Sequence, residues 1–333
     1  MRAASLYSLP SISRPNRSAA TSARLFSCTS LRSNRSRIPL DIPPPFPITK
    51  TCPEPSCSCP STPSMPAPID YDQPLNGTMA AYAQQLLICT GQRDWTSRIE
   101  EDGQGQNWGE LVRGLKSLLG RGGKYADPFN NILTASAFLF PSFKYFPSVP
   151  VNLPDSAPAT TDLSTFVRAF LLPIESRHGG QIRDQALAAE FPDAVDLQHS
   201  PVVLICGHGG RDMRCGVMAP VLETEFQRVL QSKGYTSAGS DNSVVDSPEH
   251  AHIGLISHVG GHKYAGNVIV YIPPGMKEAG SSSPHPLAGK GIWYGRIEPK
   301  HVQGVVEETI LGGKVITDHF RGAVDRESGV LRL

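Results

Sequence analysis

Two glycine-rich segments, each directly after a short apolar run, are the strongest constraint on how this chain can fold. The run VVLIC ends at Cys206 and leads into CGHGGRDMRC, which ends at Cys215. The run HIGLIS leads into HVGGHKYAGN, which holds His258 and His262. If the two runs are neighbouring strands of an open α/β sheet, both loops leave the sheet at strand carboxyl ends and meet at one edge, where such sheets bind ligands. The sequence therefore predicts one site with two cysteines and two histidines.

The elements around these loops predict an α/β fold for residues 193–333. Apolar and helical periodicity predicts strands at 202–206, 252–257, 268–272 and 292–295, and helices at about 216–230 and 299–311. Their order along the chain is the one expected for a thioredoxin-like core. Residues 233–250 and 276–289 interrupt it, and their Gly, Ser and Pro content predicts flexible surface insertions.

A second mixed α/β domain and its linker are predicted for residues 70–192, and a second thioredoxin-like fold is one option for it. Residues 79–89 are compatible with a strand or a short helix. A helix is expected at 108–119, ended by glycines, then a strand at 132–140 and a second helix at 162–172. Before this domain, residues 41–69 are so rich in Pro, Ser and Cys that a disordered, extended lead-in is expected.

The first 40 residues have the composition of a mitochondrial transit peptide. They contain seven Arg, ten Ser and no Asp, Glu or Lys. Such a segment is drawn toward the negatively charged matrix side of the inner membrane, so a mitochondrial, matrix location is predicted. Without it the chain has 24 basic against 30 acidic residues, which argues against nucleic acid as a partner. No apolar run approaches the roughly 20 residues needed to span a bilayer.

The donor set leaves several centres open. Two thiolates and two imidazoles suit a metal ion or an iron-sulfur cluster. Cys206 and Cys215 are nine apart, whereas structural zinc sites usually space their cysteines two to four apart. Glycines in both loops favour turns around a larger object, and a reversible disulfide between the two cysteines is the metal-free alternative. His208 follows Cys206 as in a Rieske loop, but Cys215 has no matching histidine, which disfavours a Rieske domain.

The two loops resemble those of the sucrase/ferredoxin-like family, as do Trp-Tyr-Gly at 293–295, Pro-Lys-His-Val at 299–302 and Asp-Trp-Thr-Ser at 94–97. The resemblance implies a thioredoxin-like ferredoxin domain with a [2Fe-2S] cluster. It assigns Cys206, Cys215, His258 and His262 as the ligands of that metal cofactor. Two imidazole ligands in place of thiolates imply a less negative reduction potential than an all-cysteine cluster has.

The function expected from this site is mitochondrial redox or electron transfer with an unidentified partner protein, in redox or thiol quality control. The alternatives are a thiol-disulfide oxidoreductase that uses Cys206 and Cys215 directly, and a non-catalytic assembly factor. No hydrolase motif is present, and the residues leave open whether the chain is an enzyme. Lys263 and Arg211 could balance charge or dock a partner, and Trp293 and Tyr294 are expected in the core.

The remaining cysteines carry weaker predictions. Cys52, Cys57 and Cys59 have no histidine nearby in the sequence and are expected to be surface thiols, with a redox or metal role as the alternative. Cys89 ends an apolar run and is expected to be a buried small hydrophobic residue.

Overall fold

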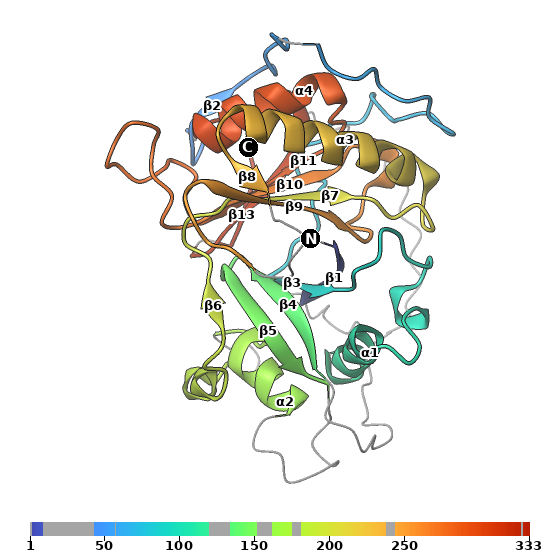
Figure 1. Cartoon of the computed structure of the whole chain (residues 1–333), viewed down its shortest axis with the longest axis vertical. Coiled ribbons are helices and arrows are strands. Elements are labelled where there is room, and N and C mark those ends of the chain that lie inside the picture. The colour runs from blue at the N-terminus through green and yellow to red at the C-terminus, as the bar shows by residue number, and fades with distance from the viewer. Residues whose placement is uncertain are drawn as a thin grey trace, which may run out of the picture.

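The computed structural model describes the backbone of residues 2–8 and residues 43–56, 58–119, 134–151, 162–174, 181–237, 244–327 and 329–333. The fold is mixed α/β and is organised around one large sheet (Figure 1). The strands are β1 (Arg2–Ser8), β2 (Ile48–Thr49), β3 (Gln84–Cys89), β4 (Thr134–Phe140), β5 (Lys144–Pro150), β6 (Val195–Asp196), β7 (Val202–Cys206), β8 (Thr236–Ser237), β9 (His250–Ile256), β10 (Val268–Ile272), β11 (Lys290–Tyr294), β12 (Val315–Ile316), β13 (Phe320–Asp325) and β14 (Gly329–Leu331). The helices are α1 (Asn107–Leu119), α2 (Leu163–Phe166), α3 (Met213–Ser232) and α4 (Pro299–Gly304).

The order of strands across the sheet is β14-β13-β11-β10-β7-β9-β1-β3-β4-β5-β6, with β8 paired to β9. β7 and β9 are parallel, β10 is antiparallel to β7, and β11 is antiparallel to β10. α3 connects β7 to the strand pair β8 and β9, and α4 follows β11, so the C-terminal half contains the elements predicted from the sequence. α3 and α4 lie on one face of this part of the sheet (Figure 1).

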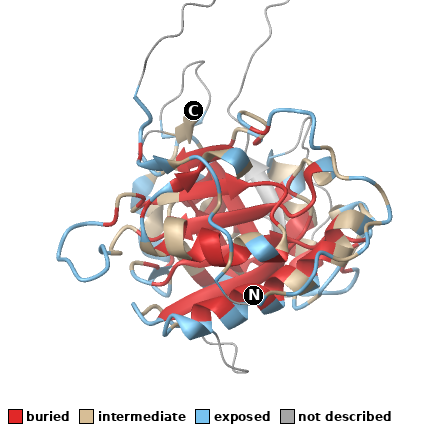
Figure 2. Ribbon diagram, turned by 90° about the horizontal axis from the view of Figure 1, so that it is seen from above, coloured by how far each residue is buried: buried red, intermediate tan, exposed pale blue. Residues whose placement is uncertain are grey.

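The core lies between this sheet and its helices, and Figure 2 shows the strands as buried ribbons with the exposed residues on loops and outer helix faces. All five residues of β7 and all five of β10 are buried, as expected for central strands covered on both faces. A wider helical turn at Val305–Leu311 continues α4, so the helical segment ends where the sequence predicted.

The N-terminal half is an antiparallel arrangement of β3, β4, β5 and β6. The helix predicted at 108–119 is α1, and the helix predicted at 162–172 is α2, prolonged by a wider turn at Val167–Leu171. Residues 79–89, left open between strand and helix, form β3 near their end. The glycines predicted to end α1, at 120, 122 and 123, lie outside the described residues, as do 132 and 133 of the predicted strand that became β4.

The segment predicted as a disordered lead-in follows a defined path. β2 pairs in parallel with β12, and Phe46 is buried with its ring in edge contact with that of Phe320, at 5.9 Å between centroids. Ser56 exchanges two hydrogen bonds with the side chain of Gln303. An extended proline-rich chain has few partners of its own, and here the C-terminal elements supply them. The expectation of disorder for 41–69 is therefore wrong for its described residues.

Two further expectations are only partly within the described residues. β1 pairs with β9 on one side and with β3 on the other, and residues 1 and 9–42 lie outside the described part of the chain. The transit peptide therefore stays a prediction.

Flexible surface insertions were predicted at 233–250 and 276–289. In the first, residues 238–243 lie outside the described part of the chain. In the other, the turn around the bridge between Lys277 and Pro284 is exposed, whereas His285 and Leu287 are buried.

Candidate metal centre

Cys206 and His258 emerge at the same edge of the sheet because β7 and β9 are parallel neighbours. Cys206, the last residue of β7, pairs with Ile256, the last residue of β9. The N–H of Gly207 then donates to the carbonyl oxygen of Ile256, 3.0 Å away, so the two chains stay side by side beyond the strands. Their parallel pairing confirms the geometric condition on which the sequence prediction depended.

Cys215 is placed by the start of α3. Asp212 caps this helix by accepting a hydrogen bond from the backbone N–H of Arg214 at 3.0 Å. Cys215 lies in the first turn and is fully buried. The N-terminus of a long helix carries a partial positive charge, which favours negative charge close to this end of α3.

The two thiol groups form a coupled pair. A hydrogen bond from Cys215 lowers the pKa of Cys206, and interaction with His258 lowers it further. The same bond and burial raise the pKa of Cys215. Cys206 is therefore the more readily deprotonated of the two, and thiolate is the form in which cysteine binds metals.

His258 and His262 are brought together by a turn that glycine makes possible. Gly260 and Gly261 adopt left-handed backbone angles, with φ of 84° and 73°. The two imidazole rings lie 5.3 Å apart between centroids. The Nδ1 atoms of both histidines are buried and lack a hydrogen-bond partner among the described residues. Because a buried ring nitrogen without a partner is costly, these two atoms mark a place for a ligand.

His262 links this interior to the surface. Its side chain is 42% exposed, and its Nε2 lies 3.9 Å from an oxygen of Asp212. Burial lowers the pKa of His262, and the salt bridge from Arg214 lowers the pKa of Asp212 to about 2. The neutral ring that metals require is therefore favoured at His262.

His208 is occupied by protein contacts. Its Nε2 lies 2.8 Å from the carbonyl oxygen of Thr96, to which it donates, and its Nδ1 accepts the backbone N–H of His258 at 2.9 Å. The residue is 3% exposed and makes an edge contact with the ring of Trp95. Both ring nitrogens are used, which agrees with the exclusion of His208 as a Rieske-type ligand.

A loop of the N-terminal half closes over the Cys206–Cys215 loop. Both carboxylate oxygens of Asp94 accept from the N–H of Gly210, at 3.1 and 3.0 Å. A Cβ at Gly210 would lie 2.2 Å from the carbonyl oxygen of Trp95, so only glycine allows this approach. The site is therefore built from both halves of the chain.

The cations beside the ligand loops are held by neighbouring loops. Lys263 donates to Asp70 at 2.9 Å, Arg211 donates to the hydroxyl of Ser97 at 3.3 Å, and Arg214 donates to the carbonyl oxygen of Pro68 at 2.7 Å. Segment 68–73 thus lies against both ligand loops, a contact that no local sequence pattern indicates.

The other singled-out residues lie away from the site. Cys52 is half-buried, and burial raises its pKa to about 12. Burial also raises the pKa of Cys89, at the end of β3. Trp293 and Tyr294 are fully buried core residues, as predicted. Cys59 is partly exposed, and Cys57 lies outside the described residues.

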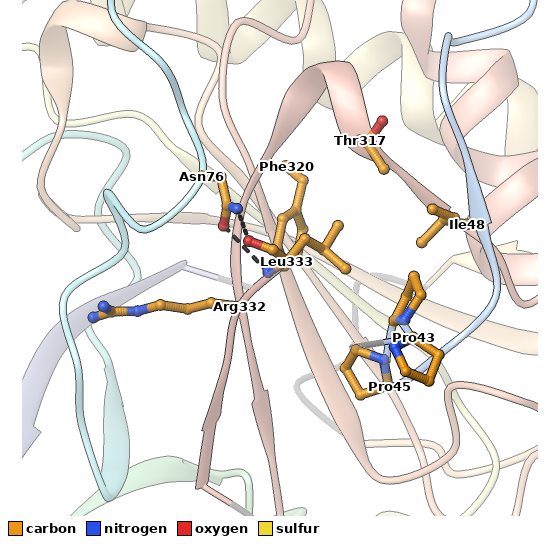
Figure 3. A pocket seen from close by; sticks show the side chains of 9 residues that line it. Pro43, Pro45, Ile48, Asn76, Thr317, Phe320, Arg332 and Leu333 are labelled. Atoms are coloured by element: carbon orange, nitrogen blue, oxygen red, sulfur yellow. Dashed lines mark hydrogen bonds between the residues drawn. The ribbon is translucent and has the colours of Figure 1, made fainter. Parts of the chain in front are cut away.

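A cavity of about 390 Å³ lies elsewhere, between residues 43–48 and the end of the chain (Figure 3). The side chain of Asn76 hydrogen-bonds both the backbone N–H and the carbonyl oxygen of Leu333 there. The cavity is lined by Pro43, Pro44, Pro45, Ile48, Asn76, Thr317, Phe320, Arg332 and Leu333. This lining includes no cysteine, histidine or carboxylate side chain, so the cavity is separate from the candidate centre.

Among the four candidate ligands, Cys206 interacts with both Cys215 and His258, and the ring centroids of His258 and His262 lie 5.3 Å apart. Within the described ranges, no three or more His, Cys, Asp or Glu side chains are arranged to hold one metal ion. None of the helices in the same ranges is both long and apolar enough to cross a membrane.

Comparison with known proteins identifies the family. The family model described as sucrase/ferredoxin-like matches residues 75–322. A protein of Debaryomyces hansenii named altered inheritance of mitochondria protein 32 is 29% identical over 83% of this chain and 96% of its own length. A Meyerozyma guilliermondii protein of the same name is 37% identical over 49% of this chain and 51% of its own length. The actin patches distal protein 1 of Saccharomyces cerevisiae is 35% identical over 39% of this chain and 36% of its own length.

No solved structure matches the chain. The match spans about half the length of the Meyerozyma relative and nearly all of the Debaryomyces one. The family model, by contrast, covers well over half of the chain and includes both ligand loops. The chain therefore belongs to the sucrase/ferredoxin-like family.

Proposed function

We propose that Cys206, Cys215, His258 and His262 bind a [2Fe-2S] cluster and that the protein is a one-electron redox protein of mitochondria. The observation that carries the proposal is the pair of buried, unpartnered Nδ1 atoms of His258 and His262 beside a buried thiol pair. The donor set fits the cofactor, because soft thiolates and imidazoles are the ligands of two-histidine clusters. When bound, the cluster would supply reversible one-electron transfer.

The sequence spacing favours a two-iron centre over zinc. Structural zinc sites usually space their cysteines two to four apart, whereas Cys206 and Cys215 are nine apart. Two thiolates and two imidazoles also match the ligand set of a two-histidine [2Fe-2S] cluster.

The residues of the site have separable roles in this proposal. Cys206 and Cys215 supply thiolate, favoured by the start of α3. Burial of the cysteines excludes water from their side of the site. The partly exposed ring of His262 offers the shortest contact with a partner protein, so electrons would enter or leave at this face.

The location and the fold name are proposals of the same kind. The composition of residues 1–40 and the names of two relatives support a mitochondrial location, and the predicted transit peptide supports the matrix. The order of β7, α3, β9, β10, β11 and α4 supports a thioredoxin-like arrangement for the C-terminal half.

A metal-free thiol-disulfide oxidoreductase is the second candidate. The lowered pKa of Cys206 favours it, because thiolate is the nucleophilic form of cysteine. Both sulfurs are buried, however, which hinders attack on a protein disulfide. We therefore place this activity second.

The test is spectroscopic and uses the full-length protein purified without oxygen. Iron and acid-labile sulfide are measured together with ultraviolet-visible and EPR spectra, before and after reduction. A coloured protein with a Rieske-type reduced EPR signal is expected. The signal should be lost or altered in His258→Ala/His262→Ala, whereas the control His199→Ala, at an exposed histidine, should keep it.

A colourless protein with two titratable thiols at Cys206 and Cys215 would replace this proposal with the dithiol function. A cluster that cannot be reduced and reoxidised without unfolding would favour a structural or assembly role instead.

A further inference from the structure

A buried guanidinium lies directly behind the histidine loop. Arg321, on β13, is 1% exposed. Its Nη1 donates to the carbonyl oxygen of Gly260 at 3.1 Å, in the turn between His258 and His262. Two more hydrogen bonds go to the carbonyl and hydroxyl oxygens of Thr78, at 2.9 and 3.0 Å. Together these bonds fix the guanidinium against the turn.

Asn267 ties this guanidinium to both ligand loops. Its Oδ1 accepts from Arg321 at 2.6 Å, and its Nδ2 donates to the carbonyl oxygen of Gly261 at 2.9 Å. Its backbone carbonyl accepts the N–H of Cys206 at 3.0 Å. One buried asparagine, 1% exposed, therefore contacts the cysteine loop, the histidine loop and the cation.

The surroundings of Arg321 keep its charge close to the site and away from water. A Cβ at Gly261 would lie 2.5 Å from Nη2, so the loop approaches the guanidinium as closely as a bare backbone allows. The rings of Tyr264 and Trp293 lie 5.6 and 5.9 Å from the guanidinium carbon. In a buried, low-dielectric setting a charge acts more strongly than the same charge does in water.

We propose that Arg321, held by Asn267, is a positioning residue that raises the reduction potential of the cofactor bound by Cys206, Cys215, His258 and His262. This inference rests on the proposed cluster. Two thiolates and two neutral imidazoles around an oxidised [2Fe-2S] core carry no net charge. One electron from an external one-electron donor adds a single negative charge, which a nearby buried cation stabilises. Arg321 also holds the turn that orients the two imidazole rings.

The test is a redox titration of the full-length protein at fixed pH, followed by EPR or absorbance. Arg321→Gln removes the charge and keeps a hydrogen-bonding group, and its midpoint potential should fall. Arg321→Lys keeps the charge, and its potential should stay near the wild-type value. The matched control is Lys290→Gln, which removes a cation from the opposite end of the neighbouring strand β11, where Lys290 pairs with Asp325. Its potential should not move.

A second variant covers the case in which Arg321→Gln does not fold. Asn267→Asp is nearly isosteric, keeps Arg321 and places a carboxylate against the guanidinium, so the potential should again fall. Unchanged potentials in cluster-loaded Arg321→Gln or Asn267→Asp would overturn the inference, as would an equal fall in Arg321→Lys. Absence of a cluster from the wild-type protein would instead overturn the proposed function, and with it this inference.

Discussion

The backbone N–H of His258 donates to Nδ1 of His208, 2.9 Å away, and this bond joins the two loops that carry the candidate ligands. The same ring donates from Nε2 to Thr96 of the N-terminal half. His208 is therefore the point at which three separate segments of the chain are held in register. Its contribution can be separated from that of the ligands, since it is not one of them.

Replacing His208 by Ala should destabilise the protein by about 1–3 kcal/mol, because the backbone N–H of His258 and the carbonyl oxygen of Thr96 lose their partner. In the proposed cluster-bound protein, the loss of iron should also become faster. His208→Asn, whose carbonyl oxygen can replace Nδ1 as acceptor, should retain more stability than His208→Ala. Urea unfolding and timed iron release measure both effects, and equal stability of the Asn and Ala variants would argue against the bond to His258.

Gly210→Ala should destabilise the contact between the two halves. The added methyl would lie 2.2 Å from the carbonyl oxygen of Trp95, so the Asp94 loop must move away. A cost of about 1–3 kcal/mol is expected, as for overpacking in a core. Asp94→Ala, which removes the acceptor without a clash, should have a smaller effect in the same urea titration. A wild-type midpoint for Gly210→Ala would show that the loop is not held where we place it.

Cys52 should react slowly with alkylating reagents in the native protein. Burial raises its pKa to about 12, so at pH 8 the thiolate fraction is far below that of an ordinary thiol. The rate should rise as pH increases through 9 and 10. Peptide mapping by mass spectrometry after a short exposure to iodoacetamide provides the measurement, with the protein in urea as control. The thiol of Cys52 packs against Gly304, at the end of α4. Rapid native labelling of Cys52 would contradict this packing.

The buried pair His250 and His252 should make stability fall in mild acid. The rings are 4.7 Å apart, and burial, assisted by His250, lowers the pKa of His252 to about 4. The unfolded chain therefore binds a proton near pH 6.5 that the folded chain binds only near pH 4. Stability should decline as pH falls through this window, by roughly 3 kcal/mol from His252. In urea titrations at pH 7, 6 and 5, His252→Leu should flatten the slope, whereas His199→Ala should not.

Local sequence patterns were sufficient to predict the strands β7 and β9, which lead into the loops with the candidate ligands. The runs VVLIC and HIGLIS are strands because their apolar residues fill both faces of a covered sheet, and the loops after them contain every candidate ligand. Proline at the start of α4 and the apolar face of α1 were equally local signals. The sequence also indicated that Cys206 and His258 would meet, since parallel neighbours end at one edge.

The parts that could not be predicted depend on contacts between distant residues. Nothing near Asp94 indicates that it accepts from Gly210, 116 residues later. Arg321 stands beside apolar residues in the strand FRGAVD, and a charged residue in that setting was the available sign of a buried cation. The lead-in lacks partners of its own, so its path depends on α4 and β12, more than 240 residues away.

The long sequence separation between residues 43–56 and their partners limits when these contacts can form during folding. A chain made from its N-terminus presents residues 43–56 long before their partners, β12 and Gln303. Contacts of such long sequence separation tend to form late in folding because loop closure must precede them. The contacts of residues 43–56 with α4 and β12 can therefore form only after the C-terminal part of the chain has been made.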